Sequence, residues 1–218
     1  MMTPERWRNT ASYLCETFGR EDSTLAALRE AARARGLPDI AVTAEVGRLL
    51  ELLVRTTAAR TVVEVGTLGG YSAVWMARAL APGGRLITIE IDAERAALAR
   101  SSFARAGLGD CIEVRHGAAL QVLPGLVAEL PPLDVVFLDA VKVEYLGYFQ
   151  AVRHRIAPAG LVLADNALGA SSWWIDDVGH PDREAMDEFN RTLVADATFD
   201  VAAVPVREGL LIARKRST

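Results

Sequence analysis

The sequence predicts an α/β protein built on a doubly wound, mostly parallel β-sheet, and three observations lead to that class. Short apolar segments rich in β-branched residues alternate with segments of helical periodicity, a pattern typical of βαβ units. A glycine-rich turn follows the first such segment, 61–65. A short connection at 207–209 joins the last two segments, which makes a hairpin and therefore brings in one antiparallel strand.

The chain begins with residues that favour helices. Thr3 followed by a proline resembles a helix N-cap, and apolar residues recur at helical spacing over about 43–56. At 218 residues, 51% of them hydrophobic, the chain is long enough for one substantial core. We therefore expect a single domain, 1–218, with an N-terminal helical region over 1–57 and an α/β core over 61–215.

The core region contains seven expected strands, with helices between the first six. Each strand is a run of apolar residues bounded by turn residues. The first of these helices is expected directly after the glycine-rich turn, with Ser72 as its N-cap. The strands are expected near 61–65, 85–90, 111–114, 133–138, 160–164, 200–206 and 209–214.

Composition and charge argue against several classes of function. The formal net charge is −4, so a broad basic surface for nucleic acid is not expected. The apolar runs are too short to cross a bilayer, and the N-terminal residues do not form a signal-peptide core. Cys15 and Cys111 lack the spacing of a disulfide framework or a zinc site. We expect a cytoplasmic protein that binds neither nucleic acid nor membrane and contains two packed thiols.

The glycine-rich turn indicates a nucleotide-like ligand without a pyrophosphate. Gly66, Gly69 and Gly70 allow a sharp turn and a close approach to a ligand, but their spacing differs from the G-x-G-x-x-G pattern of dinucleotide sites. Glu90 ends the next expected strand, 24 residues after Gly66, near the offset at which a carboxylate binds ribose hydroxyls. The pattern favours adenosine. The alternative for Glu90 is a capping role at the next helix.

Four segments together resemble a known family. They are 63–73 with the glycine loop, 88–92 with Glu90, 136–142 with an Asp-x-x-Lys motif, and 160–166, which ends in Asp-Asn. On these segments the chain resembles the small S-adenosylmethionine-dependent O-methyltransferases of the catechol and caffeoyl-CoA O-methyltransferase family, from about residue 40 to residue 215. The resemblance implies the seven-stranded methyltransferase sheet with one reversed strand, S-adenosylmethionine as cofactor, and a homodimer whose N-terminal helices contribute to substrate or partner contacts.

The resemblance also implies which residues bind the cofactor. Val42 is expected beside its methionine part, Tyr71 and Ser72 around its amino-acid end, and Gly117 and Ala118 beside adenine. The full expected set is Val42, Glu64, Gly66, Tyr71, Ser72, Glu90, Gly117, Ala118 and Asp139.

Glu64 differs from the other members of this set because it lies inside an otherwise apolar strand. A buried carboxylate costs free energy unless it is paired, so we expect it to accept hydrogen bonds near the cofactor loop. A purely structural hydrogen-bonding role is the alternative.

Asp139, Asp165 and Asn166 are the expected metal ligands. They follow strands expected to be neighbours, and two converging carboxylates are tolerated when a cation or a proton neutralises them. Carboxylate and amide oxygens suit Mg²⁺, or another hard cation such as Ca²⁺ or Mn²⁺. The alternative is that these are turn residues, since Asp and Asn are common after strands.

Lys142, three residues beyond Asp139, is the expected catalytic general base. A divalent cation that binds two vicinal oxygens would orient an aromatic acceptor and lower the phenol pKa from about 10. The metal charge and burial would also lower the pKa of the lysine. The alternative is a surface lysine paired with Glu144. Many relatives carry an acid before this lysine, where this chain has Val141, so its surroundings are less charged.

The segment 167–177 is expected to form a loop over the site. Trp173 and Trp174 could offer flat faces to an aromatic acceptor, but packing against the core or a dimer contact is favoured for each.

The expected function is methyl transfer from S-adenosylmethionine to a hydroxyl of a small catechol-like aromatic, with S-adenosylhomocysteine as product. Three alternatives are left open. They are a metal-independent methyltransferase for another small nucleophile, a nicotinamide-dependent oxidoreductase and a non-catalytic cofactor-binding module.

Overall fold

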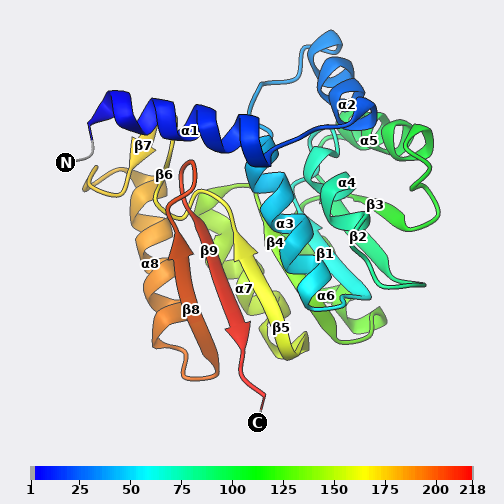
Figure 1. The fold of residues 1–218 in the computed structure, drawn as a ribbon. Helices are drawn as coiled ribbons and strands as arrows, with labels where there is room; N and C mark the ends of the chain where they lie inside the picture. The colour runs from blue at the N-terminus through cyan, green and yellow to red at the C-terminus, as the bar shows by residue number, and fades with distance from the viewer. Residues whose placement is uncertain (1–2, 218) are drawn as a thin grey trace.

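A seven-stranded sheet runs through the computed structural model, which describes residues 3–217 (Figure 1). Its strand order is β3-β2-β1-β4-β5-β9-β8. The strands are β1 (Thr61–Val65), β2 (Arg85–Glu90), β3 (Ile112–His116), β4 (Leu133–Leu138), β5 (Ile156–Ala164), β8 (Phe199–Val204) and β9 (Leu210–Lys215).

The sheet is parallel except for β9, which runs antiparallel to both β5 and β8. The chain winds outward from β1 to β3 on one side and from β4 onward on the other. The direction therefore reverses between β1 and β4, and in sheets of this kind the ligand crevice lies at that point, beyond the carboxyl ends of the strands. The predicted fold class is confirmed.

Helices cover both faces of the sheet. They are α1 (Pro4–Phe18), α2 (Ser23–Ala34), α3 (Ala44–Thr56), α4 (Tyr71–Ala77), α5 (Ala93–Arg105), α6 (Ala119–Glu129), α7 (Tyr145–Val152) and α8 (Pro181–Ala195), with 3₁₀ turns at η1 (Lys142–Glu144) and η2 (Arg153–Arg155). Side chains at several N-termini satisfy free backbone N–H groups, as when Asp22 accepts from Leu25 N at 3.0 Å. None of the helices in residues 3–217 combines the length and the apolar character needed to cross a membrane.

Two hydrophobic clusters pack against the two faces of the central strands. Val63 and Val65 face the cluster formed with α6, α7 and α8, whereas Val62 faces the cluster formed with α2, α3, α4 and α5. Strands buried on both faces read as continuous apolar runs, which is why 61–65 and 133–138 could be located from the sequence. The division into regions 1–57 and 61–215 of one domain stays a prediction.

Some boundaries differ from those expected. The third strand spans 112–116, because its pairing with β2 continues to Glu90↔His116. The fifth begins at Ile156, which pairs with Leu133 before an irregularity in the ladder. That irregular stretch contains Pro158 and Ala159, and Ala159 has a positive φ of 63°. Its residues are typical of a turn, so the sequence did not indicate a strand there.

Two further differences concern local structure near the cavity. The helix after the glycine turn begins at Tyr71 with Gly70 as its N-cap, so Ser72 is not the cap. The segment 167–177 is not wholly a loop, because it contains a small hairpin of β6 (Gly169–Ala170) and β7 (Trp173–Trp174). Gly169 permits this pairing, since a Cβ there would lie 2.1 Å from the Trp174 ring.

Candidate active site

A cavity of about 580 Å³ opens at the carboxyl ends of β1, β2 and β4, where the direction of winding reverses. Ladder hydrogen bonds continue one residue past the strands and place the site residues there. Asp139 N donates to Val65 O at 2.9 Å, and Asp165 N donates to Leu138 O at 3.0 Å. The predicted residues that line the cavity are Val42, Gly66, Tyr71, Ser72, Glu90, Gly117, Ala118, Asp139, Lys142 and Asn166.

The glycines of the first loop are required by packing within the protein. Gly66 has φ 98°, and a Cβ on it would lie 2.0 Å from the Asp139 carbonyl oxygen. Gly70 has φ 86°, and a Cβ there would lie 2.4 Å from the Phe103 ring. The predicted sharp turn is therefore present, and the close contacts that these two glycines permit are between protein groups. The close approach of a ligand stays a prediction.

Glu90 holds the glycine loop in place. Its Oε2 accepts from Leu68 N at 2.8 Å and from Thr67 N at 3.3 Å, and its Oε1 accepts from Asp92 N at 3.0 Å. These bonds fasten the β1–α4 loop to the end of β2. Asp92, not Glu90, caps α5, since its Oδ1 accepts from the first-turn N–H groups. The carboxylate of Glu90 is thus fixed at the cavity wall.

Glu64 lies behind the cavity wall, inside β1, and is fully buried. Ser72 Oγ donates a 2.5 Å hydrogen bond to its Oε1. Burial, partly offset by hydrogen bonds from Ser72 and Thr88, raises the pKa of Glu64 to about 8. The carboxyl group is therefore mostly protonated at neutral pH, and it reaches the cavity only through Ser72.

Helix α2 supports the part of the cavity wall formed by Val42 and Tyr71 through Arg29. Its guanidinium lies 4.0 Å from the centroid of the Tyr71 ring, and its Nη2 donates to Val42 O at 3.0 Å. Arg29 also pairs with Glu21 at 2.6 Å, and Glu21 accepts a 2.5 Å hydrogen bond from the Tyr71 hydroxyl. Sequence reasoning missed this network, because an isolated arginine on an amphipathic helix carries no signal of what it contacts.

Lys142 lies between Asp139 and Tyr145. Its Nζ donates to the Tyr145 hydroxyl at 2.7 Å and lies 3.4 Å from Asp139 Oδ1. The Tyr145 hydroxyl in turn donates to Leu138 O at 3.1 Å. Glu144, the alternative partner for the lysine, instead accepts from Tyr148 at 2.6 Å. Tyr145 therefore packs in the core and also positions the lysine.

Asp165 is 1% exposed and does not line the cavity itself. Its Oδ1 has no hydrogen-bond partner among the described residues. Burial, and secondly the charge of Asp139, raises the pKa of Asp165 to about 7. Asp139 and Asp165 follow the paired residues Leu138 and Ala164, which places the two carboxylates on adjacent strand ends.

The donor set fits a hard divalent cation. The oxygen donors are the unpartnered buried carboxylate oxygen of Asp165, which lies behind the cavity lining, and the side chains of Asp139 and Asn166 (φ 62°), which both line the cavity. The described residues hold no cluster of three or more His, Cys, Asp or Glu side chains suited to a metal, so the third donor would be the amide. One feature opposes binding, since Arg207 Nη1 already lies 3.6 Å from Asp165 Oδ2.

The two neighbouring tryptophans have different surroundings. Trp173 is 3% exposed, stacks on His180 with ring centroids 6.4 Å apart, and lines the cavity. Trp174 is 42% exposed and packs on Gly169. Packing therefore accounts for both, and only Trp173 also faces the cavity.

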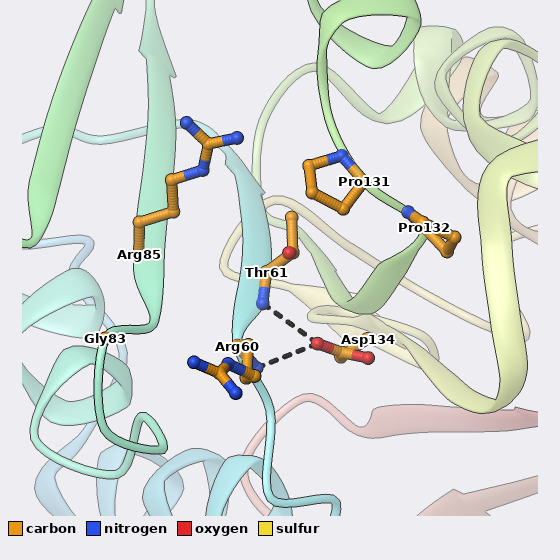
Figure 2. Close-up of a pocket in the computed structure, with 7 residues that line it drawn as sticks. All are labelled: Arg60, Thr61, Gly83, Arg85, Pro131, Pro132 and Asp134. Carbon is orange, nitrogen blue, oxygen red and sulfur yellow. Dashed lines mark hydrogen bonds between the residues drawn. The ribbon is translucent and has the colours of Figure 1, made fainter.

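A second hollow, of about 440 Å³, lies at the opposite, amino-terminal ends of β1, β2 and β4. Figure 2 shows Asp134 directed toward the start of β1, where its Oδ2 accepts from Arg60 N at 2.8 Å and Thr61 N at 2.9 Å. None of the predicted site residues lines it. Asp134 instead joins β1 to β4 at the end of the sheet away from the ligand crevice.

The doubly wound sheet, with its cavity beyond the carboxyl ends of the central strands, has the architecture of a protein that binds a nucleotide-like ligand. A model of the O-methyltransferase family matches residues 15–216, and the chain belongs to that family. It is an S-adenosylmethionine-dependent O-methyltransferase.

Three relatives illustrate the family. The chain is 36% identical over 200 residues to a catechol O-methyltransferase of Niastella koreensis, covering 91% of this chain and 90% of that enzyme. It is 29% identical to caffeoyl-CoA O-methyltransferase 2 of Zea mays, over 93% of this chain and 81% of that enzyme. The solved O-methyltransferase from Bacillus cereus in complex with S-adenosylhomocysteine superimposes with a TM-score of 0.89, at 32% identity, over 97% of this chain and 99% of that one. The predicted family and the predicted use of S-adenosylmethionine are confirmed.

Proposed function

We propose that this enzyme methylates a hydroxyl of a small aromatic that carries two vicinal hydroxyls, and that a divalent cation takes part. The observation that carries the proposal is the unpartnered, buried Oδ1 of Asp165 on the strand end next to Asp139. A buried carboxylate beside a second one requires a proton or a cation. The relation to a catechol O-methyltransferase supports the choice of acceptor.

The cofactor is proposed to bind along the glycine-loop side of the cavity. Val42, Tyr71 and Ser72 are assigned to its methionine portion, with Glu64 acting through Ser72. Glu90 is assigned to the ribose, since its Oε1 accepts only from Asp92 N and retains a lone pair for a hydroxyl. The backbone that bears Gly66, Gly117 and Ala118 would pass beside the remainder of the nucleoside.

Asp139, Asp165 and Asn166 are proposed to hold Mg²⁺ or another hard cation such as Ca²⁺ or Mn²⁺. When bound, such a cation supplies Lewis-acid polarisation and a template for two oxygens. Asp139 would contact both the cofactor and the cation. It directly follows β4, and this strand lies between β1, which leads into the glycine loop, and β5, which leads to Asp165.

Lys142 is proposed as the general base that removes the acceptor hydroxyl proton. Its side chain is only 12% exposed, so water competes little for Nζ. Tyr145 fixes Nζ at the cavity by accepting its hydrogen bond, because the Tyr145 hydroxyl proton is directed to the backbone carbonyls of Leu138 and Asp165. The deprotonated oxygen, held in line with the sulfonium methyl, can then attack the methyl carbon, so that an O–C bond forms as the C–S bond breaks and S-adenosylhomocysteine leaves. Alignment of this kind supplies a large part of the rate.

A metal-independent methyltransferase is the second candidate. One observation favours it: Asp139 is paired with Lys142 and Asp165 with Arg207, so each carboxylate already faces a cationic side chain. A metal-independent enzyme would keep its methyl-transfer activity in the presence of a chelator. The comparisons give no support to the oxidoreductase or the non-catalytic module.

The test is a methyl-transfer assay over catechols, monophenols and hydroxylated acids, with and without chelator. We expect the enzyme to methylate catechols alone. Chelation should abolish this turnover, and so should each of the substitutions Asp165→Ala and Lys142→Ala. Both variants should still bind the cofactor. Methylation of monophenols by chelated enzyme would exclude the metal-template version.

We also propose that the enzyme is a homodimer. Helix α1 exposes Trp7, Tyr13 and Phe18 by 49%, 61% and 54%, an unusual set of large apolar side chains for one surface helix. Light scattering after size-exclusion chromatography should give twice the mass of the chain, and a monomer at micromolar concentration would contradict it. The cytoplasmic location and the absence of nucleic-acid binding stay predictions.

A further inference from the structure

Arg207 belongs to no predicted site, yet its side chain lines the cavity beside the acidic pair. It lies in the turn between β8 and β9 with φ 51°, a conformation that residues with a Cβ rarely adopt. Its side chain is only 21% exposed. The strained backbone of Arg207 directs a partly buried guanidinium into the cavity, and strain of this kind indicates a functional role for the charge.

The turn that carries Arg207 is fixed to the segment that carries Asp165. Ala167 N donates to Gly209 O and Leu168 N donates to Glu208 O, each at 2.9 Å. Gly209 N closes the turn by donating to Val206 O at 2.8 Å. These backbone bonds lie within three residues of Asp165 on one side and within two residues of Arg207 on the other, so the fold holds the backbones of the two residues close together.

The contacts of the Arg207 guanidinium are ionic. Nη1 lies 3.6 Å from Asp165 Oδ2, and Nε lies 2.5 Å from Glu208 Oε2. Nη1 is buried and has no hydrogen-bond partner among residues 3–217. The arginine is therefore held near Asp165 by charge without the paired hydrogen bonds that would make this contact strong.

We propose that Arg207 is a built-in counter-cation that competes with the divalent metal for Asp165 and so weakens metal binding. This inference rests on the metal site proposed above. A positive charge fixed within a few ångströms of a ligand oxygen repels a divalent cation at that oxygen, and burial weakens the screening by water. Removal of the Arg207 charge should therefore tighten metal binding.

The test measures Mn²⁺ affinity of metal-free enzyme by the electron paramagnetic resonance signal of free Mn²⁺. Arg207→Gln removes the charge, Arg207→Lys keeps it, and Arg207→Gly removes it while suiting the positive φ. Arg153→Gln is the matched control, because it deletes an ion-paired arginine of η2, at the start of β5 and away from the cavity. Asp165→Asn tests the metal site itself, and S-adenosylhomocysteine binding reports the fold of each variant.

We expect the Mn²⁺ dissociation constant to fall at least about tenfold in the Gln and Gly variants, in line with the Coulomb energy of a nearby charge. The Lys and Arg153 variants should stay within about twofold of wild type, and Asp165→Asn should lose binding. If Asp165→Asn loses binding but neither Gln nor Gly tightens it, the role of Arg207 is overturned and the metal site stands. If wild type and Asp165→Asn bind equally, or no variant binds, both proposals fail.

Discussion

Ser72, on the first turn of α4, donates a 2.5 Å hydrogen bond to Glu64, a wholly buried carboxyl group in the middle of β1. The bond joins the central strand to the helix that follows the glycine loop. It also gives the buried acid, whose pKa burial raises from 4.5 to about 8, a contact with the cavity.

The first prediction concerns Glu64→Gln and the pH dependence of stability. Between pH 4.5 and about 8, the folded protein retains on Glu64 a proton that the unfolded chain releases, so this group loses stabilising effect as pH rises. The free energy of unfolding of the variant, relative to wild type, should therefore increase from pH 5 to pH 9 by up to about 4 kcal/mol. Urea unfolding at a series of pH values measures it, and a constant difference would contradict the raised pKa.

The second prediction concerns Arg29, which contacts Tyr71, Val42 and Glu21 at once. Arg29→Met should weaken S-adenosylhomocysteine binding about tenfold, because α2 no longer holds Val42 and Tyr71, the residues proposed to contact the methionine portion of the cofactor. The kcat at saturating cofactor should change little. Calorimetry measures the affinity. Arg33→Met, an exposed arginine in the last turn of the same helix, is the control. Equal affinities in the two variants would show that Arg29 only covers the surface.

The third prediction concerns the support of Lys142 by Tyr145. Tyr145→Phe removes the oxygen to which Nζ donates at 2.7 Å and leaves Asp139 as a weaker partner at 3.4 Å. A misplaced base should lower kcat by about ten- to a hundredfold with unchanged cofactor affinity. A rise in the KM for cofactor with normal kcat would instead place the effect of Tyr145 on the cofactor.

The fourth prediction concerns Asp134 at the opposite end of the sheet (Figure 2). Asp134→Ala leaves the N–H groups of Arg60 and Thr61 without their acceptor and should lower the free energy of unfolding by about 1–3 kcal/mol. Because the group lies away from the cavity, kcat/KM at 15 °C should be unchanged. A variant with normal stability but reduced kcat/KM would show that this hollow affects the reaction.

The sequence was enough to predict the sheet, because strands covered on both faces are continuous apolar runs such as 61–65 and 133–138. It also located the strand ends that bear Glu90, Asp139 and Asp165, since residues after parallel strands gather at one edge. The spacing of the motifs at those ends favoured adenosine, and the resemblance that these motifs carry implied the family and S-adenosylmethionine.

The contacts that depend on tertiary structure could not be predicted. Arg207 occurs in a turn whose sequence indicates only a hairpin, and its approach to Asp165 follows from the pairing of β9 with β5. Gly66 is explained by the nearby carbonyl of Asp139, 73 residues later in the chain. The start of β5 was missed because its irregular first half has the composition of a turn.

The most direct test of the central claim is anomalous diffraction from crystals grown with Mn²⁺ and S-adenosylhomocysteine. We predict one strong peak with oxygens of Asp139, Asp165 and Asn166 about 2.1–2.3 Å away, in the range expected for a hard cation, and the Arg207 guanidinium displaced from Asp165. Crystals with bound cofactor product but no peak there, and with Arg207 still paired to Asp165, would contradict the metal site.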